Sequence, residues 1–159
     1  MIGVKGEAEM IARLERRTRG IPVVAACGAV VEGLRVLGAR RIALVDPPWF
    51  DPELNGLGRR YYESSGYEVV YSAPCGLPSV QAKITPSGLH AWVVEHVSAA
   101  DAVVTGGNGF RAVGAIAALE EDLGRPVVTA NQALLWAALR VADADPGSVS
   151  DYGRLFGHG

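Results

Sequence analysis

Apolar residues along this chain form two alternating patterns, short continuous runs and longer stretches with helical spacing. Continuous runs of Val, Ile and Ala are typical of strands that are buried on both faces of a sheet. They predict strands over residues 21–26, 41–46, 68–72, 102–105 and 126–129. Strands that alternate with helices indicate βα units and a parallel sheet. The sequence therefore predicts an α/β domain with an open, mostly parallel sheet and helices on both faces.

Capping residues support these element boundaries. Asp51 and Thr85 each precede a proline, which is typical of a helix that starts with a side-chain cap. Gly38, Gly66 and Gly124 each follow a helical stretch and precede a strand. A left-handed residue is favoured at that point, and glycine adopts this conformation without strain.

Composition narrows the class of protein. The chain has 159 residues, of which 49% are hydrophobic and 20% charged, with a formal net charge of −2. This balance is typical of a globular domain and argues against nucleic-acid binding. Four arginines between residues 13 and 19 are interpreted as a solvated helix face. No apolar run is long enough for a bilayer and no signal peptide is evident, so no membrane partner and a cytoplasmic location are expected.

The glycine-rich segment at the end of the fourth predicted strand is the strongest candidate for a binding site. Gly106, Gly107 and Gly109 surround Asn108, and a helix is predicted to follow directly. Glycines let a ligand approach the main chain, and the free amides at a helix N-terminus attract anions. These residues predict a cradle for a carboxylate or phosphate. A tight turn that binds nothing is the alternative.

A dinucleotide site is a further alternative at the same segment. Gly107, Gly109 and Ala112 match a relaxed GxGxxA fingerprint. A genuine fingerprint opens its domain, and an acidic residue at the end of the next strand holds the ribose. Residues 129–131 contain no acid, so this interpretation is the weaker one.

Both cysteines follow predicted strands. Cys75 could face the cleft and act as a catalytic thiol, although a loop cysteine without a role is the alternative. Cys27 lies in a segment of small residues, where packing is the simpler explanation. Asp46 and Asp51 could form a carboxylate pair or a metal site, but Asp51 is already explained as a helix cap. Neither the cysteines nor the histidines form a ligand cluster, so no metal is expected.

Three more residues at strand exits are candidates for the wall of the pocket. Trp49 lies between prolines and a helix cap, where it could line a ligand site. Asn131 and Gln132 open the last helix, and Asn131 is also a good N-cap.

Several segments resemble maleate cis-trans isomerases and arylmalonate decarboxylases, which belong to the Asp/Glu/hydantoin racemase superfamily. The resemblance covers residues 28–45, 53–55, 66–70, 102–111, 124–136 and 151–155. It implies two similar flavodoxin-like α/β domains with the active site between them. It also implies cofactor-independent chemistry on small carboxylic acids, with one cysteine from each domain and backbone amides that hold the carboxylate.

The chain departs from this pattern in two places. The resemblance places the second cysteine of the family at Gly107, which has no side chain for proton transfer or attack. It also implies that residues 1–27 are the remnant of a first domain and that residues 28–142 form the main domain. The last helix, 131–142, would pack back on the first domain, and residues 143–159 form a tail. Either the chain is then a fragment, or its start is misplaced, or a homo-oligomer or a partner chain supplies the missing half.

The resulting expectation is a protein that binds a small carboxylic acid. Gly106, Gly107, Asn108 and Gly109 form the expected cradle, with Asn131, Gln132 and Trp49 around it. If the protein is an enzyme, it isomerises, racemises or decarboxylates its ligand without a cofactor. A non-catalytic ligand-binding or scaffolding descendant is the alternative.

Overall fold

A single parallel sheet forms the centre of the protein. The computed structural model describes residues 3–97 and 99–159. Four strands pair in the order β2-β1-β3-β4, and every pairing is parallel. They are β1 (Arg41–Asp46), β2 (Glu68–Pro74), β3 (Ala102–Thr105) and β4 (Val127–Thr129). The α/β prediction is confirmed, and four of the five predicted strands are present.

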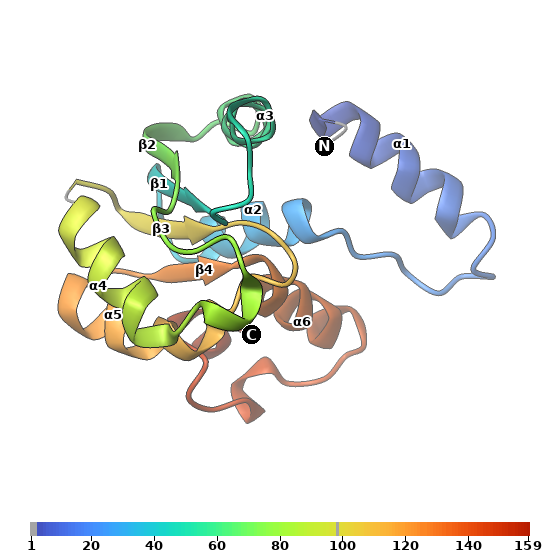
Figure 1. Ribbon diagram of the computed structural model, residues 1–159. Coiled ribbons are helices and arrows are strands. Elements are labelled where there is room, and N and C mark those ends of the chain that lie inside the picture. Colours follow the sequence, from blue (N-terminus) through green and yellow to red (C-terminus); the bar gives the residue numbers. More distant parts are fainter. Residues whose placement is uncertain (1–2, 98) are drawn as a thin grey trace.

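Helices cover both faces of the sheet (Figure 1). One face packs against α2 (Ala26–Val36), α3 (Pro52–Ser64) and α6 (Ala130–Val141). The other packs against α4 (Pro86–His96) and α5 (Ile116–Leu123). Because both faces are covered, every residue of β1 after Arg41 is buried, which explains the continuous apolar run. Short 3₁₀ turns lie at Gln81–Lys83, Val113–Ala115, Pro146–Ser148 and Arg154–Gly157.

The C-terminal tail is part of the packed body. Leu155 and Phe156 are buried in the core that α2 and α6 share with the sheet. Helix α6 lies directly against α2. The last helix and the tail therefore stabilise the face of the sheet on which α2 lies.

The predicted caps are confirmed. Asp51 Oδ1 accepts a hydrogen bond from the Leu54 amide at 2.7 Å, and Thr85 Oγ1 accepts one from the Gly88 amide at 3.1 Å. The three predicted left-handed glycines have φ values of 72°, 92° and 66° at Gly38, Gly66 and Gly124. These local signals fix where α3, α4 and the β-strands begin.

The predicted strand over residues 21–26 is wrong. Residues 21–25 pair with no strand among the described residues, and α2 begins at Ala26. The side chain of Ile21 is 69% exposed, because the segment crosses open surface rather than entering the sheet. An apolar run forms a buried strand only where a neighbouring strand satisfies its backbone groups.

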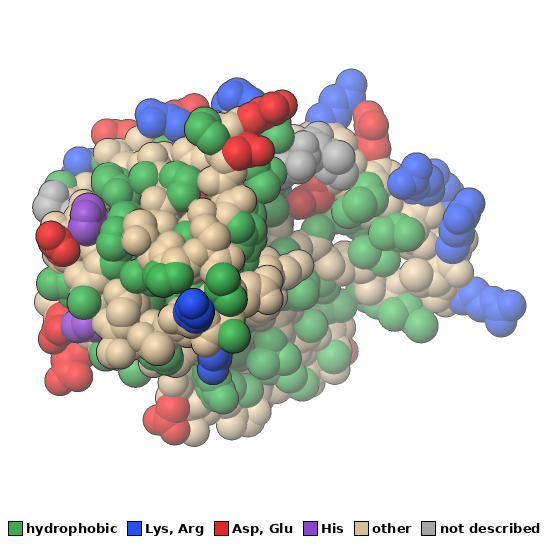
Figure 2. All heavy atoms as spheres, in the orientation of Figure 1, with side chains coloured by type: hydrophobic (Ala, Val, Ile, Leu, Met, Phe, Trp, Pro, Cys, Tyr) green, Lys and Arg blue, Asp and Glu red, His purple; other side chains and the backbone are tan. Residues whose placement is uncertain are grey.

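The segment instead connects the body to an N-terminal arm, α1 (Gly3–Glu15), which projects to one side (Figure 1). None of its residues is buried. The Tyr61 hydroxyl of α3 donates a hydrogen bond to Glu7 Oε1 at 2.7 Å and ties the arm to the body. Basic side chains gather along this N-terminal region (Figure 2). Arg13 on α1 and Arg16 and Arg19 in the turn after it are exposed, so the cluster is solvated as predicted, but only part of it lies on a helix. None of the described helices is long and apolar enough to span a bilayer.

Candidate active site at the carboxyl edge of the sheet

A cavity of about 250 Å³ lies where β1 and β3 end. Parallel α/β sheets bind ligands at this edge, because the strand exits and the following helix N-termini converge there. Val30, Leu44, Phe50 and Leu54 supply its apolar wall. No lysine, arginine or histidine is among the described residues that line it. An anion that enters would therefore have to be held mainly by amides and the Tyr62 hydroxyl.

The glycine-rich loop forms one side of this cavity. Gly106, Gly107 and Asn108 line it, whereas Gly109 lies outside the lining and faces Gln81. The Gly107 and Asn108 amides donate no hydrogen bond to any described residue, so both are available to a ligand. Gly107 has a φ of 81°, a left-handed conformation that favours glycine.

The prediction that this loop runs directly into a helix is wrong. Helix α5 begins at Ile116, seven positions after Gly109, so its N-terminus does not reach the loop. The dinucleotide fingerprint requires that its glycines lie at the start of a helix. Gly107 and Gly109 do not, so the structure does not support this alternative. A ligand at this loop would therefore have to be held by the loop's own amides.

Two other helices begin at the cavity. Ala26 is the first residue of α2 and Ala130 the first of α6, and both line the space. The N-cap of α2 is Ala25, which has no side-chain cap. The first-turn amides of α2 thus lack the usual oxygen partner, and the positive end of the helix dipole favours an anion there.

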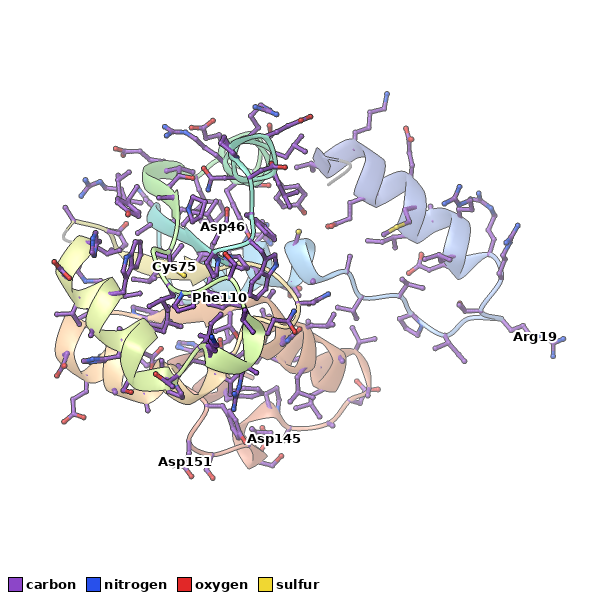
Figure 3. The ribbon with its side chains drawn as sticks, in the orientation of Figure 1. Arg19, Asp46, Cys75, Phe110, Asp145 and Asp151 are labelled. Carbon is purple, nitrogen blue, oxygen red and sulfur yellow. The ribbon has the colours of Figure 1, made fainter. Side chains whose placement is uncertain are left out.

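Asp46 is the one carboxyl group among the described lining residues. It ends β1 and is only 2% exposed (Figure 3). Its Oδ2 accepts a hydrogen bond from Asn55 Nδ2 at 2.7 Å, and Asn55 also contacts Ser72 Oγ. Burial raises the pKa of Asp46 to about 6, and the Asn55 hydrogen bond only partly opposes this. Near neutral pH, Asp46 therefore exchanges readily between its two protonation states.

Cys27 and Tyr62 bring two further acids to the same cavity. Burial raises the pKa of the Cys27 thiol to about 11, and the carboxylates of Glu7 and Asp46 add to this. Burial likewise raises the pKa of Tyr62, and its neighbours Cys27 and Asp46 raise it further. The Tyr62 hydroxyl takes part in none of the hydrogen bonds of the described chain. Thiol and phenol thus stay protonated at neutral pH, and both can donate to a ligand.

The structure does not bring the other predicted residues into the cavity lining. Cys75 lies beside Asp46 in the backbone, but its side chain is 3% exposed and packs in the core on the α4 side. Trp49 packs edge-on against Phe110 with ring centroids 6.0 Å apart, and its neighbour Phe50 lines the cavity instead.

Asn131 and Gln132 also lie outside the lining. The prediction that Asn131 caps the last helix is wrong. Thr129 is the N-cap, and its side chain and that of Gln132 form a reciprocal capping box. Gln132 also donates to the Tyr152 carbonyl, which holds the tail. Among residues 3–97 and 99–159, no group of three His, Cys, Asp or Glu side chains could hold a metal ion.

The sequence model of one protein family, described as arylmalonate decarboxylase, matches residues 2–156. The chain belongs to this family. Arylmalonate decarboxylase of Bordetella bronchiseptica is 30% identical over 149 residues, covering 89% of the chain and 60% of that protein. A maleate isomerase of Pseudomonas putida is 33% identical over 129 residues, covering 79% of the chain and 51% of that protein.

The fold of the family is shared as well. A crystal structure of arylmalonate decarboxylase superposes with a TM-score of 0.87 at 27% identity, covering 99% of the chain and 70% of that structure. The chain thus spans between half and two thirds of the length of the two curated relatives. Family membership confirms the resemblance to arylmalonate decarboxylases and maleate isomerases that the sequence indicated.

Sequence reasoning considered Asp46 and Cys27 but set both aside, and it missed Phe50 and Tyr62 as lining residues. Asp46 carried a usable signal, because it is the last residue of a strand that is predicted to exit at the ligand-binding edge. Cys27 was placed at a strand exit, but its small neighbours favoured a packing role. Nothing in the sequence pattern distinguishes Phe50 from Trp49, because a turn decides which ring faces inwards.

The raised pKa of Cys27 predicts low thiol reactivity. At pH 7.5, alkylation by iodoacetamide should be roughly 100-fold or more slower than for an exposed cysteine of pKa about 8.5, because so little thiolate is present. In a Cys75→Ser variant, Cys27 is the remaining cysteine, so all alkylation is measured at its thiol. Glu7→Gln should speed the alkylation, because the Glu7 carboxylate raises the pKa of Cys27. Labelling as fast as that of free cysteine would contradict the assigned environment.

Proposed function

We propose that the cavity binds a small malonate-type carboxylic acid and decarboxylates it. The observation that carries this proposal is the convergence of the free Gly107 and Asn108 amides with the uncapped N-terminus of α2 around one space. Preorganised N–H donors stabilise negative charge as it develops on a carboxylate oxygen. The names of the relatives, an arylmalonate decarboxylase and a maleate isomerase, support a carboxylic acid as the ligand.

Decarboxylation fits the side chains better than isomerisation through a thiol adduct does. Position 107 has no side chain, and Cys27 is almost entirely protonated at neutral pH, so no thiolate is ready to attack. Loss of CO₂ requires no nucleophile. The electron pair of the broken bond moves onto the remaining carboxylate as an enediolate, which the amides can hold.

Binding and turnover can be measured on the same protein. Phenylmalonate or maleate at about 100 times its Kd should add about 2.7 kcal/mol to the free energy of unfolding, raising Tm by about 5–10 °C. CO₂ release from phenylmalonate, followed with a pH indicator, then tests turnover. The neutral diamide of phenylmalonate is the matched ligand control and should give no shift.

A pair of variants on α6 tests the location. Ala130→Leu fills the cavity, whereas Ala138→Leu adds the same side chain at an exposed position of the same helix. We expect Ala130→Leu to abolish the Tm shift and Ala138→Leu to keep it. Binding without CO₂ release would instead indicate a non-catalytic carboxylate-binding protein. Absence of any Tm shift in the wild type would refute the proposal.

A further inference from the structure

We propose that Asp46 is the proton-transferring residue of this cavity. It would supply, from the end of β1, the group that a glycine at position 107 cannot supply. This inference rests on the proposed function, because it assigns the proton that decarboxylation requires.

The carboxyl group has the position that this role needs. One oxygen, Oδ2, is held by Asn55, which fixes the orientation of the group. The other, Oδ1, accepts no hydrogen bond within the described chain. Oδ1 also lies close to Gly106: a Cβ atom added to this glycine would be 2.5 Å from Oδ1. The free oxygen therefore sits beside the loop whose next two amides would hold the ligand.

The contacts of Asp46 within the described chain do not explain why a carboxyl group is buried at this position. A buried carboxylate is normally paired with a cation, because burial of an unpaired charge is unfavourable. Among residues 3–97 and 99–159, the titratable groups that interact electrostatically with Asp46 are acids: Cys27 on α2, Tyr62 on α3 and Cys75 after β2. Glu7 on α1 adds a further negative charge next to Cys27. A structural role would favour a neutral residue here, whereas a proton donor must be ionisable.

The bond between the α-carbon and one carboxylate of the ligand breaks, CO₂ leaves, and the electron pair forms an enediolate. The Asp46 carboxyl then gives its proton to the α-carbon, which completes the monocarboxylate product. The resulting Asp46 carboxylate takes a proton from water. One proton is consumed in each turnover.

This scheme couples binding to protonation. An incoming dicarboxylate repels ionised Asp46, so the ligand binds together with one proton. With a pKa of about 6 in the free protein, Asp46 is mostly ionised at pH 7.5, and nearly one proton should be taken up for each ligand bound. Above pH 6, kcat/KM should fall about tenfold per pH unit, because this parameter reports the free enzyme.

Asp46→Asn tests the assignment, with Asp51→Asn as the matched control. Asp51 is exposed on the same connection, loses the same charge, and asparagine caps a helix equally well. Proton uptake is measured by calorimetry of phenylmalonate binding in buffers of different ionisation enthalpy. Decarboxylation of phenylmalonate is measured over pH 5–9 for the wild type and both variants. The ionisation of the substrate then affects all three proteins equally and cancels in the comparison.

We expect Asp46→Asn to bind phenylmalonate without proton uptake and to lose about 10²–10⁴-fold in kcat, whereas Asp51→Asn behaves as wild type. Wild-type binding without proton uptake would overturn the inference and leave the proposed ligand class intact. Turnover of Asp46→Asn within threefold of wild type would have the same two consequences. Binding of phenylmalonate by the wild type without its decarboxylation would have them as well. Absence of wild-type binding at every pH would refute the proposed function itself.

Discussion

Replacing Asp46 with asparagine should stabilise the protein by up to about 3 kcal/mol at pH 7, although it removes the proposed catalytic group. Burial raises the pKa of Asp46 from 3.8 to about 6, and each unit of difference corresponds to about 1.4 kcal/mol. Asparagine has nearly the same shape, and its oxygen can still accept the hydrogen bond from Asn55. Chemical denaturation of the two proteins measures the difference.

The pH dependence follows from the same pKa difference. Between pH 4 and 6 the folded protein binds more protons than the unfolded chain, so the free energy of unfolding of the wild type falls as pH rises through this window. Asp46→Asn should remove this contribution. Asp51→Asn should keep it, since that carboxyl is an exposed cap. A destabilised Asp46→Asn protein at pH 7 would show that the carboxylate is structurally favourable.

Replacing Gly107 with alanine should cost about 2–4 kcal/mol of stability, the sum of left-handed backbone strain and steric overlap. The φ of Gly107 is 81°, and a Cβ at this position would overlap Cγ of Pro47 and lie 3.5 Å from Cζ of Phe50. Gly107→Cys should suffer the same penalty, so a thiol added there should not create a working site by itself.

Matched variants separate the two contributions. Gly124 has a φ of 66° and open space around its Cβ position, so Gly124→Ala should show only the backbone strain, about 1–2 kcal/mol. A Pro47→Ala, Gly107→Ala double variant should recover the overlap part, visible as a coupling energy in urea denaturation. Equal costs for Gly107→Ala and Gly124→Ala would show that Pro47 yields freely.

Much of the fold could be predicted because local signals agreed with one another. Continuous apolar runs located β1 to β4, and the caps at Asp51 and Thr85 located the starts of α3 and α4. The same apolar signal failed at residues 21–26, because pairing with a neighbouring strand is a tertiary property. It also failed after Gly109, where a loop and a 3₁₀ turn precede α5.

The site was predicted less completely than the fold. The glycine loop was visible because glycine density is a local feature, and Gly106, Gly107 and Asn108 do line the cavity. Asp46 could be placed at the ligand-binding edge as the last residue of a predicted strand, but the direction of its side chain could not be predicted. Every residue of β1 after Arg41 is buried, so no alternation in the sequence indicates which face of the sheet Asp46 occupies.

The close approach of Pro47 to Gly107 constrains how this chain could evolve. A lineage that acquired cysteine at position 107 while keeping Pro47 would lose folding stability before it gained any thiol chemistry. A change at position 47 would have to come first, and alone it would bring no new reactivity. The two positions are thus epistatic, and this order of events makes the glycine state difficult to reverse one substitution at a time.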